Sequence, residues 1–221
     1  MNNKAKNSIE KDITIKQKIL VCSLDLFAMK GYAETSIRDI AKSVGSNIGT
    51  IYSYFSSKED ILVCMLNDYY EYTKNMYFRQ DLMAILKNNP TSEGVASCII
   101  TSISVLTSNE FYLKLFHLVH VEQHRIDLFG NFLLKRFNET TEFVERIIEV
   151  LKALNIVNDK INAEYWGVTI FSLLYSLSNC IAIQTRQNSQ GYTNKDISNI
   201  VHYMSEVMLN TYKCEPTNIT D

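Results

Sequence analysis

The sequence has few of the residues that interrupt helices. Its 221 residues include only two prolines and seven glycines, and nearly all of the glycines fall where a helical pattern ends. Proline and glycine destabilise helix interiors, so their scarcity leaves long stretches of uninterrupted helical periodicity. No stretch shows the apolar–polar alternation that is typical of half-buried strands. We therefore predict an all-α protein.

The number and spacing of the cysteines argue against two classes of small domain. The five cysteines are odd in number, lie far apart and form no C-x-x-C pair, which argues against a disulfide framework and against a zinc module. We expect reduced, buried thiols in a cytoplasmic protein, and a redox-sensing thiol stays open as the alternative. The N-terminus is polar through Asp12 and lacks the apolar stretch of a signal peptide,.

The chain lacks a large excess of either charge, and its formal net charge is −2 at pH 7. The charges are unevenly distributed, because residues 1–60 hold nine Lys/Arg against seven Asp/Glu and the remainder holds thirteen against seventeen. Only the face that meets phosphate has to be basic. The first 60 residues are therefore the part of the chain suited to nucleic acid.

One long segment lacks charge altogether. Residues 165–185 contain no charged residue, and this length is close to what spans a bilayer. Its polar side chains oppose membrane insertion: Thr169, Ser172, Ser176, Ser178, Asn179 and Thr185. We expect a helix that is buried on nearly all sides, inside a helical body or a subunit interface.

A helix-turn-helix pattern occupies residues 37–55. An apolar stripe at i, i+3, i+4 and i+7 predicts the first helix, which carries Ile37, Ile40, Ala41 and Val44,. Ser36 and Asp39 have the spacing of a capping box at its start, and Gly45 follows its end, where positive φ is common. Asn47 is a good N-cap for a second short helix, in which Ile51 and Phe55 recur at i, i+4. Two such helices around a glycine turn predict a module whose second helix enters the DNA major groove.

Residues 16–66 resemble the N-terminal domain of the TetR family of bacterial transcriptional regulators. The matching pieces are Leu26-Phe27, Gly31-Tyr32, residues 35–41 (Thr-Ser-Ile-Arg-Asp-Ile-Ala), residues 49–55 (Gly-Thr-Ile-Tyr-Ser-Tyr-Phe) and Lys58-Glu59. They lie in register across about the first third of the chain. Two features depart from the family pattern: Ser46-Asn47 replaces an apolar residue and serine, and Ile48 stands where relatives often carry a polar base-facing residue.

The DNA contacts are assigned by role. The positions expected on phosphates are Thr35, Tyr52, Tyr54 and Lys58. The positions expected on the exposed side of the recognition helix are Asn47, Ile48, Gly49, Thr50 and Ser53. Asparagine can pair with adenine, and the isoleucine and threonine methyl groups can touch thymine methyls. The alternative for the two tyrosines is core packing, and an N-terminal arm with Lys4, Lys6 and Lys11 either tracks DNA or is a solvated tail.

The rest of the chain is predicted to form a helical body. Helices are expected over about 58–78, 82–86, 92–107, 109–127, 130–154, 160–187 and 194–212. We divide the chain into a disordered arm (1–12), a helix-turn-helix DNA-binding domain (13–57), a helical effector-binding and dimerisation domain (58–213) and a disordered tail (214–221).

The TetR resemblance implies that the last two long helices pair with those of a second subunit. The sequence itself supports close packing, since small residues recur on one helix and an apolar stripe follows on the next. The residues assigned to this homodimer interface are Gly167, Ser172, Ser176, Cys180, Val201, Met204 and Met208. The alternative is that both helices pack within one subunit.

The resemblance also implies a small effector among the middle helices. We assign to its pocket Tyr69, Phe111, Phe116, His117, His120 and Trp166, because an apolar lining with a few polar groups is typical of ligand sites. The alternative for most of the aromatics is core packing. His117, His120 and His124 fall at i, i+3 and i+7, a spacing that can also chelate a metal. No second cluster of metal ligands accompanies them, so we predict neither a metal nor a cofactor.

These patterns together predict a TetR-like repressor that binds an inverted-repeat operator as a dimer and is released by a small, largely apolar effector. One alternative is a DNA-binding protein without an effector, acting as an activator or in chromosome organisation. The other is a helical enzyme or metal protein, which is disfavoured because no nucleophile–base grouping or paired carboxylates are visible.

Overall fold

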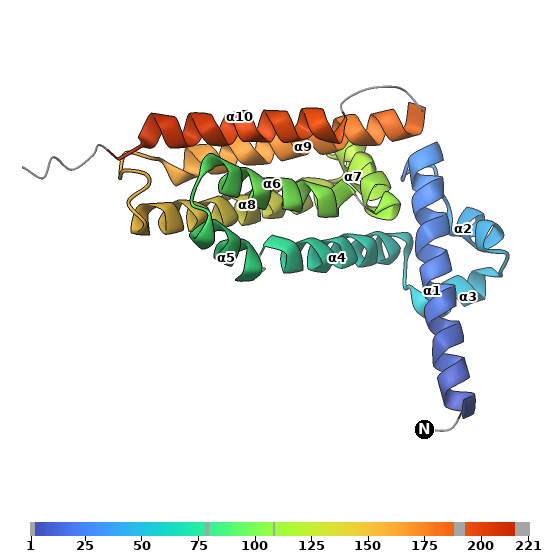
Figure 1. Ribbon diagram of the computed structural model, residues 1–221. Coiled ribbons are helices and arrows are strands. Elements are labelled where there is room, and N and C mark those ends of the chain that lie inside the picture. Colours follow the sequence, from blue (N-terminus) through green and yellow to red (C-terminus); the bar gives the residue numbers. More distant parts are fainter. Residues whose placement is uncertain (1–2, 78–79, 108, 188–192, 215–221) are drawn as a thin grey trace, which may run out of the picture. The chain divides into compact units, whose positions relative to one another are not determined.

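The computed structural model describes residues 3–77, 80–107, 109–187 and 193–214, and these residues form ten helices (Figure 1). They are α1 (Asn3–Lys30), α2 (Ile37–Val44), α3 (Ile48–Tyr54), α4 (Lys58–Tyr77), α5 (Gln80–Asn88), α6 (Ser92–Thr107), α7 (Glu110–Glu122), α8 (Asp127–Ala153), α9 (Ala163–Gln187) and α10 (Asn194–Tyr212). The predicted all-α class is confirmed. No helix within the described residues is both long and apolar enough to cross a membrane.

The chain forms two compact units. The first comprises residues 1–71 and 110–121, and the second comprises residues 72–109 and 122–221. The predicted boundary between residues 57 and 58 coincides with the start of α4 at Lys58. The first compact unit continues past that boundary, however, and it also includes most of α7.

The first unit is built on the apolar faces of α1 to α4. α1 packs against α2, and α2 packs against α3. Four isoleucines with no exposed surface fill the space between these helices: Ile19, Ile40, Ile51 and Ile61. α7 is held within the unit by an ion pair between Lys114 and Asp25 at 2.6 Å and by an edge-to-face contact between Tyr69 and Tyr112. Burial of these side chains supplies the main stabilisation, because each contributes about 1.5–3 kcal/mol.

The second unit is a layered helical bundle in which α6, α8, α9 and α10 run along one another (Figure 1). α8 packs along α9, and α10 packs along α6. At Gly167 the two helices of the first pair are so close that an added Cβ would lie 2.8 Å from Oγ1 and 3.0 Å from Cα of Thr141. Glycine is therefore needed at this crossing of α8 and α9.

A buried charge pair joins α8 to the end of α4. Arg136 and Glu139 are 4% and 7% exposed. Arg136 Nη1 donates hydrogen bonds to Glu139 Oε2 at 2.6 Å and to Thr73 Oγ1 at 2.7 Å. Because a buried charge needs a partner, this network fixes the position of α4 against α8 within the second unit.

The structure describes part of each end that was predicted to be disordered. Residues 3–12 continue α1, because no glycine or proline between positions 3 and 30 interrupts the helix. At the other end, the Cys214 N–H donates to the Ile156 carbonyl oxygen, and the Asn158 N–H donates to that of Tyr212. Cys214 is therefore ordered, and the rest of the predicted tail, residues 215–221, lies outside the described residues.

Two helix boundaries also differ from the prediction. α7 ends at Glu122 instead of near residue 127, and α8 begins at Asp127 instead of Gly130. The Glu122 carbonyl oxygen accepts the N–H groups of both Arg125 and Ile126, which closes a turn. Ile126 then adopts an extended conformation before α8 starts. This turn places residues 123 and 124 in the lining of a groove in the second unit.

Candidate nucleic-acid interface

The two short helices of the helix-turn-helix have the caps that their sequence predicts. Ser36 Oγ accepts the Asp39 backbone N–H, and the Asp39 carboxylate accepts the Ser36 N–H at 3.0 Å. Gly45 has a φ of 73°, the left-handed conformation that ends α2,. Asn47 Oδ1 accepts the Thr50 N–H at 2.8 Å and so caps α3. The predicted capping box, turn and N-cap are confirmed.

Hydrogen bonding also sets the charge state of the first cap. The pKa of Asp39 is lowered from 3.8 to about 2, first by the Ser36 backbone N–H, then by the Ser36 hydroxyl and by Lys30. Hydrogen bonds to the charged form of a carboxyl favour that form. Asp39 therefore stays ionised at the N-terminus of α2, where a negative charge also interacts favourably with the helix dipole.

Lys58 binds the protein's own backbone. Its Nζ donates to the carbonyl oxygens of Tyr32 at 2.7 Å, Ala33 at 3.2 Å and Thr35 at 2.8 Å. It also lies 4.4 Å from the centre of the Tyr32 ring, and desolvation lowers the pKa of this ammonium. An ammonium has three N–H donors, so this geometry uses all of them. Lys58 thus holds the loop between α1 and α2 in this structure, and its contact with phosphate stays a prediction.

Thr35 is a second predicted phosphate contact, and the structure corrects it. Its side chain is buried, and its hydroxyl donates to the Gly31 carbonyl oxygen at 2.8 Å. Its backbone N–H donates to the Tyr32 carbonyl oxygen. Thr35 therefore stabilises the same loop that Lys58 holds, and its side chain is not available to DNA.

The remaining predicted contacts lie on or near the accessible side of α3. Asn47, Gly49, Tyr52 and Ser53 are exposed, whereas Ile51 faces the core. Three further predicted residues are partly exposed: Ile48, Thr50 and Tyr54. The Tyr52 side chain is 54% exposed, so core packing does not account for it. The assignment of these residues to DNA remains a prediction.

The cap limits what Asn47 can do at a base pair. Its Oδ1 accepts both the Thr50 N–H at 2.8 Å and the Thr50 hydroxyl at 3.2 Å. A bidentate contact to adenine needs the oxygen and the nitrogen of the amide together. Because the oxygen serves the cap, the predicted pairing of Asn47 with adenine is incompatible with this conformation.

Two basic residues on α2 were not singled out from the sequence. Arg38 and Lys42 are four residues apart and both are exposed. The signal was present, because they lie opposite the apolar stripe that carries Ile40, Ala41 and Val44. Within the part of the chain that the structure describes, neither side chain makes a hydrogen bond or an ion pair, which leaves both suited to bind phosphate oxygens next to the recognition helix,.

The residues of the predicted dimer interface differ in burial: some are buried within their own chain and others are exposed. Val201 and Met208 are buried within their own chain, and Gly167 packs against Thr141 of α8. These three residues are therefore corrected to intrachain packing. Ser172 and Ser176 are exposed, and Cys180 and Met204 are partly exposed. The outer sides of α9 and α10 also carry exposed apolar residues, namely Tyr165, Val168, Ile183 and Tyr203.

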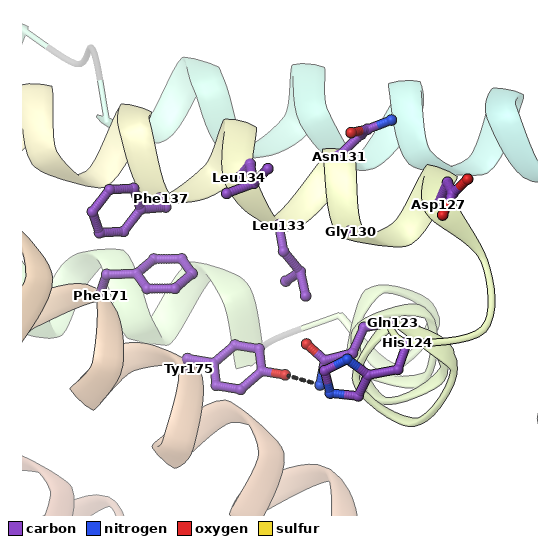
Figure 2. Close-up of a pocket in the computed structure, with 10 residues that line it drawn as sticks. All are labelled: Gln123, His124, Asp127, Gly130, Asn131, Leu133, Leu134, Phe137, Phe171 and Tyr175. Atoms are coloured by element: carbon purple, nitrogen blue, oxygen red, sulfur yellow. Dashed lines mark hydrogen bonds between the residues drawn. The ribbon is translucent and has the colours of Figure 1, made fainter.

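The predicted effector residues are distributed over both compact units. Tyr69, Phe111, Phe116, His117 and His120 belong to the first unit, whereas Trp166 belongs to the second, where it lies edge-to-face on Tyr212. None of the six lines the groove of about 800 Å³ between α8 and α9, shown in Figure 2. Their assignment to an effector pocket remains a prediction.

The predicted histidine face is interrupted. His117 and His120 lie on α7, but His124 follows the end of that helix and lines the groove between α8 and α9. Across the described part of the chain, no group of three or more His, Cys, Asp or Glu side chains is placed to hold a metal ion. The five cysteines are free thiols, and Cys98 is the one that is fully buried.

Comparison with known proteins agrees with the geometry of the first unit. The profile of the bacterial regulatory proteins of the tetR family matches residues 19–64. The chain is 48% identical over 59 residues to the HTH-type transcriptional regulator YuxN of Bacillus subtilis, across 26% of this chain and 20% of that protein. It is 25% identical over 111 residues to the fatty acid metabolism regulator protein of the same organism, across 50% of this chain and 55% of that protein. The matches thus span between a fifth and about half of these relatives' length.

The fold extends the likeness to nearly the whole chain. A TetR-family transcriptional regulator from Mesorhizobium loti superposes with a TM-score of 0.66 at 18% sequence identity, covering 91% of this chain and 98% of that one. At this identity the superposition establishes the fold alone. Residues 19–64 therefore form a helix-turn-helix domain of the kind found in the tetR family of bacterial regulatory proteins, within a chain that has the fold of that family's solved members.

Proposed function

We propose that the protein is a repressor that binds an inverted-repeat operator as a dimer and is released by a small effector. The observation that supports it most strongly is the recognition helix, which is capped at its start and presents an exposed face that carries no acidic residue. In this proposal residues 13–57 bind DNA, and residues 58–213 bind the effector and the second subunit.

The structure favours a modified set of DNA contacts. Gly49 and Ser53 are suited to approach the base edges, since both are exposed on α3. Tyr52, Arg38 and Lys42 take the phosphates, because phosphate contacts come from hydroxyl, guanidinium and ammonium donors on exposed side chains. Lys58 and Thr35 act indirectly by fixing the loop that precedes α2.

Dimerisation is proposed through the outer face of α9 and α10. Tyr165 and Tyr203 are 70% and 65% exposed, and aromatic side chains of this kind are enriched at protein interfaces. Small residues on the same side of α9, Ser172 and Ser176, permit close helix approach. A dimer would also match the two half-sites of an inverted repeat, set about 34 Å or one helical turn apart.

The interface is tested by introducing a charge at its proposed centre. Ser176→Arg would bury an unpaired charge between the subunits, which costs several kcal/mol, so we expect a monomer on a sizing column coupled to light scattering. Asp159→Asn, in a fully exposed side chain, is the matched control and should leave the mass unchanged. A folded dimer of Ser176→Arg with wild-type affinity would place the interface elsewhere.

α4 provides a physical connection between effector and DNA sites. Lys58, at its start, holds the loop before α2, and Thr73, four turns later, accepts a hydrogen bond from Arg136 of α8. A displacement of α8 would therefore act on α4, the helix whose Lys58 holds the loop before α2. An effector can shift the equilibrium only through different affinities for the two states, and coupling of this kind is typically about 1–3 kcal/mol.

Selection of bound sequences from a random DNA pool tests the central claim. We expect the purified protein to enrich an inverted repeat, and operator DNA to weaken effector binding by the factor with which the effector weakens DNA binding. Enrichment of single half-sites would contradict the dimer, and the absence of any preferred duplex would contradict the DNA-binding function. An enriched repeat whose affinity no effector changes would indicate a regulator without an effector.

A further inference from the structure

The groove between α8 and α9 has the size and composition of a ligand site. Its volume is about 800 Å³, within the range of small-molecule sites, and Figure 2 shows the ten residues that line it. Four large apolar side chains form its walls: Leu133, Leu134, Phe137 and Phe171. Leu134 is 63% exposed, so apolar surface faces solvent here.

An aromatic row forms one wall of the groove. The Phe137 and Phe171 rings meet edge-to-face, with centroids 5.4 Å apart. The Phe171 and Tyr175 rings are stacked, 5.9 Å apart with an interplanar angle of 22°. Tyr175 is held in turn by the Gln123 amide, which donates to its hydroxyl at 3.0 Å. The Tyr175 end of the row is therefore fixed, which reduces the ordering cost of binding.

A glycine leaves space on the α8 side of the groove. Gly130 lies inside α8 and lines the groove, and an added Cβ would meet only the Gln123 carbonyl oxygen, at 3.8 Å. Glycine is thus not required by packing at this position, although it weakens the helix relative to alanine. A side chain placed at residue 130 would occupy the groove without distorting α8.

The charge of the lining distinguishes between classes of ligand. Of the ten residues that line the groove, Asp127 is the one with a formal charge at neutral pH, and neither lysine nor arginine is among them. Nearby Arg125 is 76% exposed and pairs with Glu122 at 3.7 Å, while Arg136 is buried and bonds to Glu139. Figure 2 places Asp127 at one end of the groove and Phe137 and Phe171 at the other. A negative charge with no lysine or arginine among the lining residues favours a cation and disfavours a carboxylate or phosphate.

We propose that this groove binds a cationic amphiphile, such as an amine or quaternary ammonium on a hydrocarbon or aromatic body. The body would lie on Leu133, Leu134 and the aromatic row, and the cationic end would lie near Asp127. The role of the groove as the effector site of a repressor rests on the proposed function, whereas binding of a ligand to the groove does not require DNA. Phe137 follows Arg136 on α8, so an occupied groove would act on the turn that contacts Thr73 of α4.

Calorimetry on the full chain without DNA tests the proposal. The probes are decyltrimethylammonium and decanoate, which share a chain length and differ in the charge of the head group, each below its micelle-forming concentration. We expect one site per chain and about two- to fivefold tighter binding of the cation, a ratio typical of an exposed charge pair. Asp127→Asn should abolish that preference, and the control Asp159→Asn should preserve it.

A bulky side chain at position 130 tests whether the probes bind in the groove. Gly130→Leu should abolish binding of both probes while the melting temperature stays the same or rises, which keeps loss of binding distinct from loss of fold. Tighter binding of decanoate, unchanged binding to Gly130→Leu, or no binding of either probe would each overturn the proposal. The last result, together with a change of mass in Gly130→Leu, would assign the groove to a second copy of the chain. Failure of the DNA selection would leave these titrations unaffected, so the two claims fail separately.

Discussion

Replacing Lys58 by methionine separates two roles for a lysine in a DNA-binding domain. The side chain reaches three backbone carbonyls of the loop before α2, at 2.7, 3.2 and 2.8 Å. Methionine keeps most of the aliphatic stem and removes the three donors. If Lys58 holds the loop, Lys58→Met weakens the fold. If Lys58 neutralised a phosphate, the same change would reduce the salt dependence of DNA binding instead.

The cost follows from the three hydrogen bonds. Bonds to a charged group contribute about 1.5–3 kcal/mol each, but the loop is partly exposed and water can solvate the released carbonyls. We therefore expect a net loss of about 2 kcal/mol, including a cation–π term of roughly 0.5 kcal/mol for Tyr32. For a chain of this size that loss lowers the melting temperature by about 4–8 °C.

Two measurements on two variants decide the question. Thermal melting should be lowered for Lys58→Met and unchanged for Lys42→Met, whose side chain is exposed on α2. The logarithm of the operator affinity should fall with the logarithm of salt concentration as in the wild type for Lys58→Met. For Lys42→Met that slope should be smaller by about 0.9, the contribution of one phosphate contact. Wild-type melting combined with a flatter salt slope for Lys58→Met would refute the structural role.

Three further perturbations test the packing and the caps. Arg136→Met should cost about 3–5 kcal/mol by stranding the buried Glu139 carboxylate, and the double variant with Glu139→Leu should recover most of this loss in a denaturant melt. The pKa of Asp39 falls from 3.8 to about 2 on folding, so the stability that its ionised carboxylate contributes is present above pH 4 and is lost as the pH falls towards 2. The difference in melting temperature between wild type and Asp39→Asn should therefore vanish over that pH window. Gly167→Ala should destabilise by about 1–3 kcal/mol through contact with α8, whereas Gly130→Ala should stabilise by roughly 0.5–1 kcal/mol, and an opposite order would contradict the α8–α9 geometry.

Local signals predicted the helix-turn-helix well. The capping box at Ser36, the left-handed Gly45 and the N-cap at Asn47 all occur where the sequence placed them. These features depend on residues three or four positions apart, so their partners are visible in the sequence. The helix over 92–107 was predicted with the same boundaries for the same reason.

Contacts between distant residues could not be predicted in this way. Lys58 bonds to backbone atoms 23 to 26 positions away, and Arg136 bonds to Thr73, 63 positions away. Periodicity shows which face of a helix is apolar, but it does not show where the end of a long side chain lies. The family resemblance suggested that Lys58 contacts a DNA phosphate. In the folded chain, the loop before α2 places three carbonyl oxygens within hydrogen-bonding distance of the Lys58 ammonium.

The turn between α7 and α8 shows another limit. Neither glycine nor proline marks residues 123–126, so the helical pattern gave no reason to end α7 at Glu122. Gly130 suggested a boundary, but it lies inside α8. This turn affects the groove, because it brings Gln123 and His124 into the lining. Gly130 also lines the groove, from within α8.

Among the small residues of α9 that the sequence analysis assigned to close helix approach, the structure shows such an approach at Gly167, within its own chain. Gly167 packs on Thr141 of the same chain, whereas Ser172 and Ser176 remain exposed. A sequence contains no information on which neighbour a small residue approaches, since intrachain and intersubunit helix packing follow the same rules. The exposed side of α9 is therefore better defined by burial in the structure than by residue size.

The recognition helix limits what one subunit can achieve alone. Its sequence, Ile-Gly-Thr-Ile-Tyr-Ser-Tyr, contains no arginine, lysine or glutamine, so the strongest base-reading side chains for guanine are absent. In the proposed function Arg38 and Lys42 supply attraction to phosphate, which is independent of sequence. Specific affinity would then come from two half-sites bound together by the proposed dimer, because linkage makes the second contact intramolecular and raises affinity without new contacts. An effector that changes the separation of the two recognition helices would remove that gain. On this proposal, the specificity of so neutral a recognition helix depends on the spacing that the helical body sets.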